Sequence, residues 1–185
     1  HSLFGIQSWV ALPAKDEDRG AFFSHHPELA LPTLEDVGVK ASLVAGSAWG
    51  GRSPVEQLSE MFYVDVKLEA SASIPLPDEH EDRAVHVMQG EIEVADQIFE
   101  TGNMIIFRPG DKISVKAGVK GARIILLGGA TLEGPRYIWW NFVSSSLEKI
   151  EVAKTDWAAG EWENGRFQLP IGDKDEFIPL PNKSP

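Results

Sequence analysis

The chain has 185 residues, 43% of them hydrophobic and 24% charged, and this balance predicts a globular domain with its own core rather than a disordered or fibrous chain. It has no cysteine, which excludes disulfides, thiolate zinc sites and thiol nucleophiles. The net charge of −11 at pH 7 disfavours nucleic-acid and membrane-surface partners, no apolar run approaches the roughly 20 residues of a membrane span, and we therefore expect a cytoplasmic protein.

The first apolar run, residues 3–12, predicts a strand that ends before Pro13. No turn or cap precedes this strand, so we expect residues 1–13 to belong to, or bridge from, an upstream domain; a processed or engineered start is the alternative. We also expect its large side chains to pack on the domain that follows, because leaving Ile6 and Trp9 in water would create a patch prone to aggregation.

Residues 14–38 predict a linker, because prolines, a run of charges and the pair His25-His26 interrupt any period. Short strand-like runs then continue, at 39–45, 61–68, 83–88, 91–94, 104–107, 112–116 and 123–127. Glycine-rich turns at 89–91, 100–103, 109–111 and 118–121 separate many of them. Turns that recur about every ten residues are typical of an all-β sandwich or barrel.

One helix is predicted, over residues 145–159. Ser145 and Glu148 fit a capping box, and Gly160 supplies the stop signal. The apolar face of this helix would consist of Leu147, Ile150, Ala153 and Trp157. Residues 144–185 are therefore expected to form a helix followed by an extended tail that lies across the surface.

Two segments, 83–94 and 102–111, resemble the paired signature motifs of a cupin jelly-roll barrel. The flanking segments 3–13, 44–50 and 134–143 resemble the second half of a pirin-type bicupin, and the resemblance covers nearly the whole chain. It implies an all-β fold: a cupin-type jelly-roll β-barrel over residues 39–143, with one C-terminal α-helix and an extended C-terminal tail.

In the pirin family two cupin barrels face each other, and the amino-terminal barrel holds an iron through three histidines and a glutamate. The resemblance places those ligands upstream of Leu3. We therefore expect no metal ligand and no catalytic residue in this chain, and iron only in the N-terminal cupin. That N-terminal cupin is the expected partner, and other protein partners remain open.

The first cupin motif indicates which ligand positions this barrel has lost. Taking Gly90 as the motif glycine places Arg83 where the family has its metal-binding glutamate. The histidine positions then fall on 76–79, which contain no histidine, and His80 is one residue out of step.

The second motif gives the same result. Gly102 and Gly110 place Ile113 in the remaining histidine position. An arginine and an isoleucine supply neither the negative charge nor the lone pairs that a divalent cation needs. We therefore expect no metal binding in this barrel.

Arg83 is expected to face the barrel interior, where a desolvated guanidinium needs acceptors for its five donors. Glu79 is the nearest acid in sequence, with Asp78 second. We therefore predict a bidentate ion pair that replaces the metal as the electrostatic centre of the barrel. Glu79, Arg83 and Ile113 are the degenerate cupin-site positions.

Three other groups have plain structural explanations. The pair His25-His26 is interpreted as an exposed loop, because neighbouring side chains diverge in extended chain. The acidic run 78–82 is interpreted as a solvated turn rather than a site for a hard cation. Serines 144–146 are explained by the helix cap, since no Gly-x-Ser-x-Gly elbow surrounds them.

His86, Trp139 and Trp140 are the candidate interface residues. His86 alternates with Val85 and Val87 and should point out of the barrel, where it could contact a second barrel. The two tryptophans are expected to fill a core or an interface, with a stacking platform for a ligand as the alternative.

Two hypotheses for function follow. The first is a degenerate cupin without a metal site that supports an iron-binding N-terminal cupin and binds protein partners. The second assigns the longer protein an iron-dependent activity of the quercetin dioxygenase type, which the resemblance implies for some relatives. Only the first can hold for these residues alone.

Overall fold

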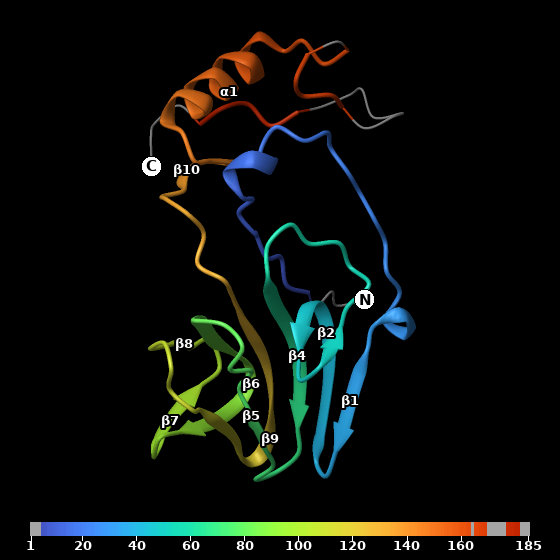
Figure 1. Cartoon of the computed structure of the whole chain (residues 1–185), viewed down its shortest axis with the longest axis vertical. Coiled ribbons are helices and arrows are strands. Elements are labelled where there is room, and N and C mark those ends of the chain that lie inside the picture. Colours follow the sequence, from blue (N-terminus) through green and yellow to red (C-terminus); the bar gives the residue numbers. More distant parts are fainter. Residues whose placement is uncertain (1–4, 164, 170–176, 182–185) are drawn as a thin grey trace. The chain divides into compact units, whose positions relative to one another are not determined.

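The computed structural model describes residues 5–163, 165–169 and 177–181, and the chain divides into two compact units. One, here called the barrel unit, comprises residues 20–131. The other, here called the helical unit, combines the chain up to Arg19 with the chain from Leu132 onward. Figure 1 labels most of the strands of the barrel unit and the helix α1.

The barrel unit is built from antiparallel strands. They are β1 (Thr33–Asp36), β2 (Val39–Ala48), β3 (Gly51–Arg52), β4 (Met61–Leu68), β5 (Ser73–Pro75), β6 (Asp82–Val94), β7 (Gln97–Glu100), β8 (Met104–Phe107) and β9 (Ser114–Gly129), preceded by the short 3-10 helix η2 (Glu28–Ala30). The main sheet has the order β1-β2-β4-β9-β6-β7, with β3 beside β2, β5 beside β9 and β8 beside β6. This arrangement confirms the predicted all-β class.

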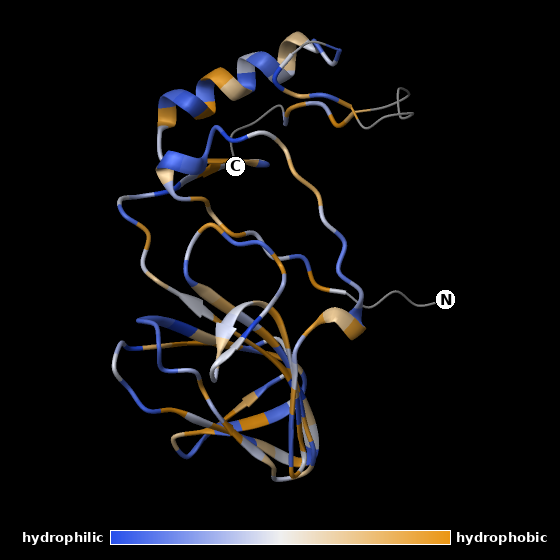
Figure 2. Ribbon diagram, turned by 45° about the vertical axis from the view of Figure 1, so that its right-hand side comes forward, coloured by the Kyte–Doolittle hydropathy of each residue, from blue (hydrophilic) through white to orange (hydrophobic). Residues whose placement is uncertain are grey.

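The core of the barrel unit follows from alternation along its central strands. In β4, Phe62, Val64 and Val66 are fully buried while the residues between them are partly exposed, so one face of the strand points inward. Figure 2 shows the matching hydrophobic stretches along these strands. The inward faces of β2, β6 and β9 complete one continuous apolar cluster.

Two predicted turns are bends inside long strands. The predicted runs 83–88 and 91–94 lie in the single strand β6. Residues 114–116 of the predicted run 112–116 belong to β9 together with 123–127, while residues 112 and 113 precede that strand. Gly90 and Gly121 have φ of +81° and +78°, and a Cβ at Gly90 would collide with the carbonyl of Gly121. The glycines therefore allow two paired strands to bend at close approach rather than end.

The predicted linker also contains a strand. Residues 33–36 form β1 and pair with 39–42 of β2, so the sheet begins before Val39. At the other end, residues 132–143 belong to the helical unit. The compact unit 20–131 thus begins before the predicted barrel range 39–143 and ends earlier than it. Strand β1 gave no apolar signal, because all four of its residues are exposed.

The helical unit contains η1 (Ala14–Asp16), the hairpin of β10 (Tyr137–Trp139) and β11 (Phe142–Ser144), and α1 (Leu147–Ala159). Phe142, Ile150 and Ala153 are its buried centre, with tryptophans and Phe167 packed around them. The Nε1 of Trp157 donates to the carbonyl of Ile178 at 3.0 Å, which holds the described tail residues 177–181 against this unit. The rest of the predicted tail after residue 169 lies outside the described residues.

The helix starts later than predicted. Its N-cap is Ser146, whose hydroxyl accepts from the backbone N–H of Lys149, so Glu148 is not in the position that a capping box requires. Leu147 is 60% exposed and does not join the apolar face, whereas Ile150 and Ala153 do. Gly160 ends the helix in the left-handed region with φ of +68°, as predicted.

The predicted N-terminal strand is wrong for the described residues 5–12. They have no strand pairing, and Ile6, Trp9 and Val10 are about half exposed, at 48%, 53% and 53%. The segment belongs to the helical unit rather than to the barrel unit, and its predicted packing on the barrel stays a prediction. A strand forms only beside a partner strand, and no described strand offers one here. Residues 1–4 lie outside the described residues.

Candidate functional site

The degenerate cupin position is occupied by Arg83, near the start of β6. Arg83 lies directly opposite Gly128 of β9 and Phe107 of β8. It alternates with Val85 and Val87 on the interior face and is only 2% exposed. This placement agrees with the predicted inward orientation.

The guanidinium of Arg83 is poorly satisfied. Its Nη2 donates to the carbonyl of Arg108 at 3.2 Å, while Nε and Nη1 are buried without a hydrogen-bond partner. The predicted ion pair with Glu79 is wrong, because Glu79 is exposed and no described carboxylate pairs with Arg83. A carboxylate on the turn before β6 keeps its hydration there, and burying it beside Arg83 would forfeit that hydration.

Ile113 has become part of the packing. It is partly buried and lies against the interior cluster, and its carbonyl accepts from the N–H of Leu76 at 2.9 Å. The position that holds a histidine ligand in metal-binding cupins thus supports the barrel wall.

These residues do not fit a divalent cation. A buried guanidinium repels a cation, and the described residues contain no group of three or more His, Asp or Glu side chains that could hold one.

A pocket of about 590 Å³ lies on the barrel unit. Its polar lining comes from the end of β2, from β3, from the loop before β4 and from the turn before β6: Ser47, Arg52, Gln57, Ser59, Glu60, Glu79 and His80. The Oε1 of Gln57 accepts from the N–H of Gly46 at 2.7 Å, which fixes its carboxamide. The ring of His80 stacks on Phe62, with centroids 6.0 Å apart and 13° between the planes.

The candidate interface residues lie in different places. His86 is on the outer face of β6, and its Nδ1 is buried without a partner. Trp139 and Trp140 pack around Phe142 in the helical unit, so they fill a core. The Nζ of Lys154 lies 4.7 Å from the ring centre of Trp139, which adds a cation–π contact.

The remaining predicted groups have structural surroundings. His25 is exposed, and the Nε2 of His26 lies 3.2 Å from the Ser24 hydroxyl. In the acidic run, Asp82 accepts from the hydroxyl of Thr131 at 2.9 Å. The hydroxyl of Ser144 donates to the carboxylate of Glu17 at 3.0 Å and so belongs to a network of structural hydrogen bonds before α1.

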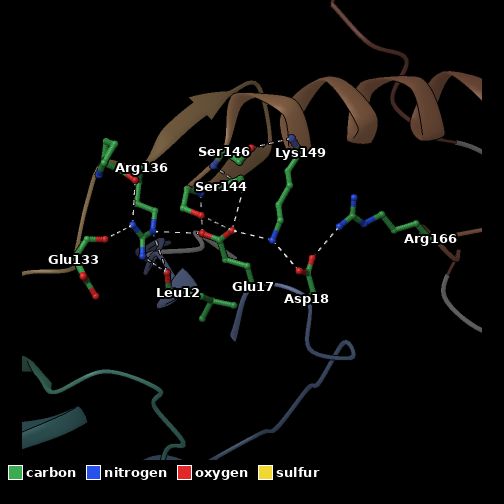
Figure 3. Close-up of polar contacts among 11 residues, drawn as sticks. Leu12, Glu17, Asp18, Glu133, Arg136, Ser144, Ser146, Lys149 and Arg166 are labelled. Atoms are coloured by element: carbon green, nitrogen blue, oxygen red, sulfur yellow. Dashed lines mark hydrogen bonds and ion pairs between the residues drawn. The ribbon is translucent and has the colours of Figure 1, made fainter. Parts of the chain in front are cut away.

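Sequence reasoning missed Glu17, which is the centre of the largest polar network described. Its carboxylate accepts from the N–H and hydroxyl of Ser145, at 2.7 and 3.0 Å, and lies 3.5 Å from the Nε of Arg136 (Figure 3). Burial raises the pKa of Glu17, but the hydrogen bonds from Ser145 and Ser144 and the charge of Lys149 outweigh it, so the pKa lies below 4.5. A charged residue in a predicted linker gave no signal of this role.

Comparison with known proteins shows which family the chain belongs to. The sequence profile of the Pirin C-terminal cupin domain matches residues 63–168. The chain belongs to the pirin family. A pirin-like protein of Caulobacter vibrioides is 44% identical over 178 residues, a match that covers 96% of this chain and 59% of that relative.

Solved structures show the same fold. Quercetin 2,3-dioxygenase from Acinetobacter baumannii superposes with a TM-score of 0.81 at 24% identity, over 94% of this chain and 56% of that one. The cupin jelly roll predicted for this pirin is therefore confirmed. The chain spans somewhat more than half the length of the relatives it matches, and it corresponds to their C-terminal half. None of the described helices is long and apolar enough to cross a membrane.

Proposed function

We propose that this chain is the C-terminal half of a two-cupin protein and that its role is to dock and support an iron-binding N-terminal cupin, without a metal of its own. The observation that carries the proposal is an apolar face on the outside of the barrel unit. This face lies on β8, β6 and β9, opposite to the interior face that holds Arg83.

Strand β8 supplies the exposed part of this outer face. Met104 and Ile106 are 55% and 77% exposed, and they lie directly opposite His86 and Ala84 of β6. Directly opposed residues share a face, so the four side chains form one surface. The side chains of this surface are not part of the barrel core. Ile105, which points to the other side of β8, packs against that core instead.

Strand β9 continues the same surface. Ile125 and Leu127 lie opposite His86 and Ala84, on the face that points away from the interior cluster. Ile125 and Ala84 are already covered within the chain, at 3% and 8% exposure, so the open part of this face is on β8. A strand that is apolar on both faces is typical of a sheet covered on both sides. A second sheet packed here would bury the outer face at the usual inter-sheet distance of about 10 Å.

His86 gives this face a polar anchor. Its Nδ1 is buried and has no partner among the described residues, although most buried polar atoms in proteins have one. The exposed segment 5–12, with Ile6 and Trp9, supports the same proposal, because a strand of the upstream cupin would supply its missing partner.

The test uses the protein extended upstream to the length of its relatives. We expect it to bind iron with this half contributing no ligand, and Ile106→Glu to lower its melting temperature and expose β8 to hydrogen exchange. Val119→Glu is the matched control, because Val119 is also 77% exposed but lies outside the face. Iron bound by this half, or equal effects of the two variants, would contradict the proposal.

The activity of the longer protein is a separate question that the same material can answer. A Pseudomonas aeruginosa relative named for quercetin 2,3-dioxygenase is 30% identical over 179 residues, which favours an oxygen-dependent activity. We propose that any such activity resides upstream. Oxygen uptake with quercetin should therefore require the extended protein and be absent from residues 1–185 alone.

A further inference from the structure

The pocket of about 590 Å³ on the barrel unit is lined by charges of both signs, which come from separate elements. Arg52 lies on β3, Glu60 ends the loop before β4, and Glu79 lies on the turn before β6. All three residues are exposed, and none of them forms an ion pair or a side-chain hydrogen bond within the described chain. The pocket therefore has one positive and two negative groups that the fold does not pair with one another.

The positive group is placed by the hairpin of β2 and β3. Arg52 lies directly opposite Ser47 of β2, and directly opposed residues share a face, so the two side chains project from the same face of the hairpin. Both residues line the pocket, and the Ser47 hydroxyl has no partner among the described residues. A guanidinium beside a hydroxyl offers several donors to one anionic group, and a carboxylate matches the planar fork of arginine.

The two negative groups lie on segments that are held to the barrel. The carbonyl of Glu60 accepts from the N–H of Ala130 at 2.9 Å, and Gln57 of the same loop accepts from the N–H of Gly46 at 2.7 Å. Glu79 precedes His80, whose ring stacks on the buried Phe62. The carboxylates are thus presented by anchored segments, while the carboxylate groups themselves stay open to a ligand.

These charges select against simple ions. Glu60 and Glu79 repel an anion, and Arg52 repels a cation, whereas a molecule that carries both charges is attracted by both sets. The lining also contains three apolar side chains, which belong to Ala48, Leu58 and Met61. The volume lies within the range of about 300–1,000 Å³ that is typical of small-molecule sites. The pocket therefore has room for an apolar group in addition to the two charges.

We propose that this pocket binds a small zwitterion, namely a free amino acid with an apolar side chain. Its carboxylate binds Arg52 and Ser47, its ammonium group binds Glu60 and Glu79, and its side chain lies against the apolar part of the lining. The inference is independent of the docking face on β8, because no residue of that face lines the pocket.

The test is titration of the 185-residue chain with leucine, N-acetylleucine and leucinamide at constant ionic strength. Binding is followed by calorimetry and by the ring resonances of His80, which lines the pocket. We expect saturable binding of leucine. N-acetylleucine lacks the ammonium group and leucinamide lacks the carboxylate, so each should bind about tenfold more weakly or less. Glycine should also bind more weakly than leucine, because it has no side chain to bury.

Two variants separate the charges. Arg52→Gln should weaken leucine binding about tenfold and leave the binding of leucinamide unchanged, because leucinamide has no carboxylate. Glu79→Gln should weaken leucine binding and leave that of N-acetylleucine unchanged. Arg108→Gln and Glu81→Gln are the matched controls, since they remove equal charges from exposed residues outside the lining, and both should bind leucine like the wild type. Circular dichroism checks that all four variants fold.

Three results would overturn the proposal. Binding of N-acetylleucine or leucinamide as tight as that of leucine would mean that the pocket does not require both charges. Equal losses in Arg52→Gln and Arg108→Gln would mean that leucine binds elsewhere. Absence of saturable leucine binding to the wild type would mean that water alone satisfies the charged groups of the pocket.

Discussion

The Nε of Arg136 lies 3.5 Å from a carboxylate oxygen of Glu17, and both side chains are largely buried, at 10% and 8% exposure. The same guanidinium donates twice to the carbonyl of Leu12, at 3.0 and 2.9 Å. Glu17 in turn accepts from the serines that precede α1. This pair therefore connects the N-terminal segment of the helical unit to its hairpin and helix.

Glu17→Gln should lower the free energy of unfolding of the helical unit by about 1–3 kcal/mol, because Arg136 and the serine donors lose a charged acceptor in a buried place. Tryptophan fluorescence during urea unfolding reports on this unit, which contains Trp139, Trp140 and Trp157. Asp18→Asn is the control: Asp18 is 62% exposed and pairs with Lys149 at the surface, so its loss should cost much less than the loss of Glu17. Equal losses in the two variants would contradict the assigned role of Glu17.

The same carboxylate should make stability depend on acid. The pKa of Glu17 is lower in the folded state than its ordinary value of 4.5. A group with a depressed folded pKa stabilises the fold fully above its unfolded pKa, and that contribution is lost as the pH falls through the folded pKa. The wild type should therefore lose stability below pH 4.5 more steeply than Glu17→Gln, which has no proton to bind. Parallel pH profiles from thermal unfolding of the two proteins would count against this linkage.

Gly46→Ala should be far more destabilising than Gly102→Ala. Both glycines have positive φ, +81° and +91°, so both substitutions carry the left-handed strain of roughly 1–2 kcal/mol. A Cβ at Gly46 would also collide with the backbone carbonyl of Met61, whereas a Cβ at Gly102 meets nothing within 4 Å. We expect the Gly46 variant to lose roughly 2 kcal/mol more than the Gly102 variant in denaturant unfolding. Similar losses would show that the strands β2 and β4 separate easily at this point.

Strand alternation made much of the barrel predictable. The bounds of β4 and β8 follow from the sequence residue for residue, because each is a short apolar run between turn signals. Strands β6 and β9 were each predicted as two shorter strands, because Gly90 and Gly121 indicated turns. A glycine that allows a strand to bend looks the same in the sequence as a glycine that ends a strand. Strand β1 gave no signal, because all four of its residues are exposed.

The candidate site was predictable in position but not in contacts. The motif register places Arg83 inside the barrel, and the structure agrees. The partner of Arg83 was predicted from closeness in sequence, which selected Glu79, whereas the acceptor found is the carbonyl of Arg108 on the loop after β8. Contacts between distant segments, like those of Glu17 with Arg136, depend on tertiary packing that local patterns do not encode.

Arg83→Met should leave stability unchanged or raise it. A predicted buried ion pair would have made loss of the arginine cost roughly 3–5 kcal/mol, because a carboxylate would be left without its partner. The structure shows no such carboxylate, and two of the three nitrogens of the guanidinium are buried without acceptors. Methionine keeps much of the volume and removes the charge and the unsatisfied donors, so the desolvation penalty disappears while the interior position opposite Phe107 stays filled. Arg83→Ala should be less stable than Arg83→Met by about 1–3 kcal/mol, since it leaves a cavity in the barrel.

Chemical denaturation of the wild type, Arg83→Met and Arg83→Ala in phosphate buffer measures this order of stability. An Arg83→Met protein that is several kcal/mol less stable than the wild type would show that Arg83 is satisfied by a partner within the chain.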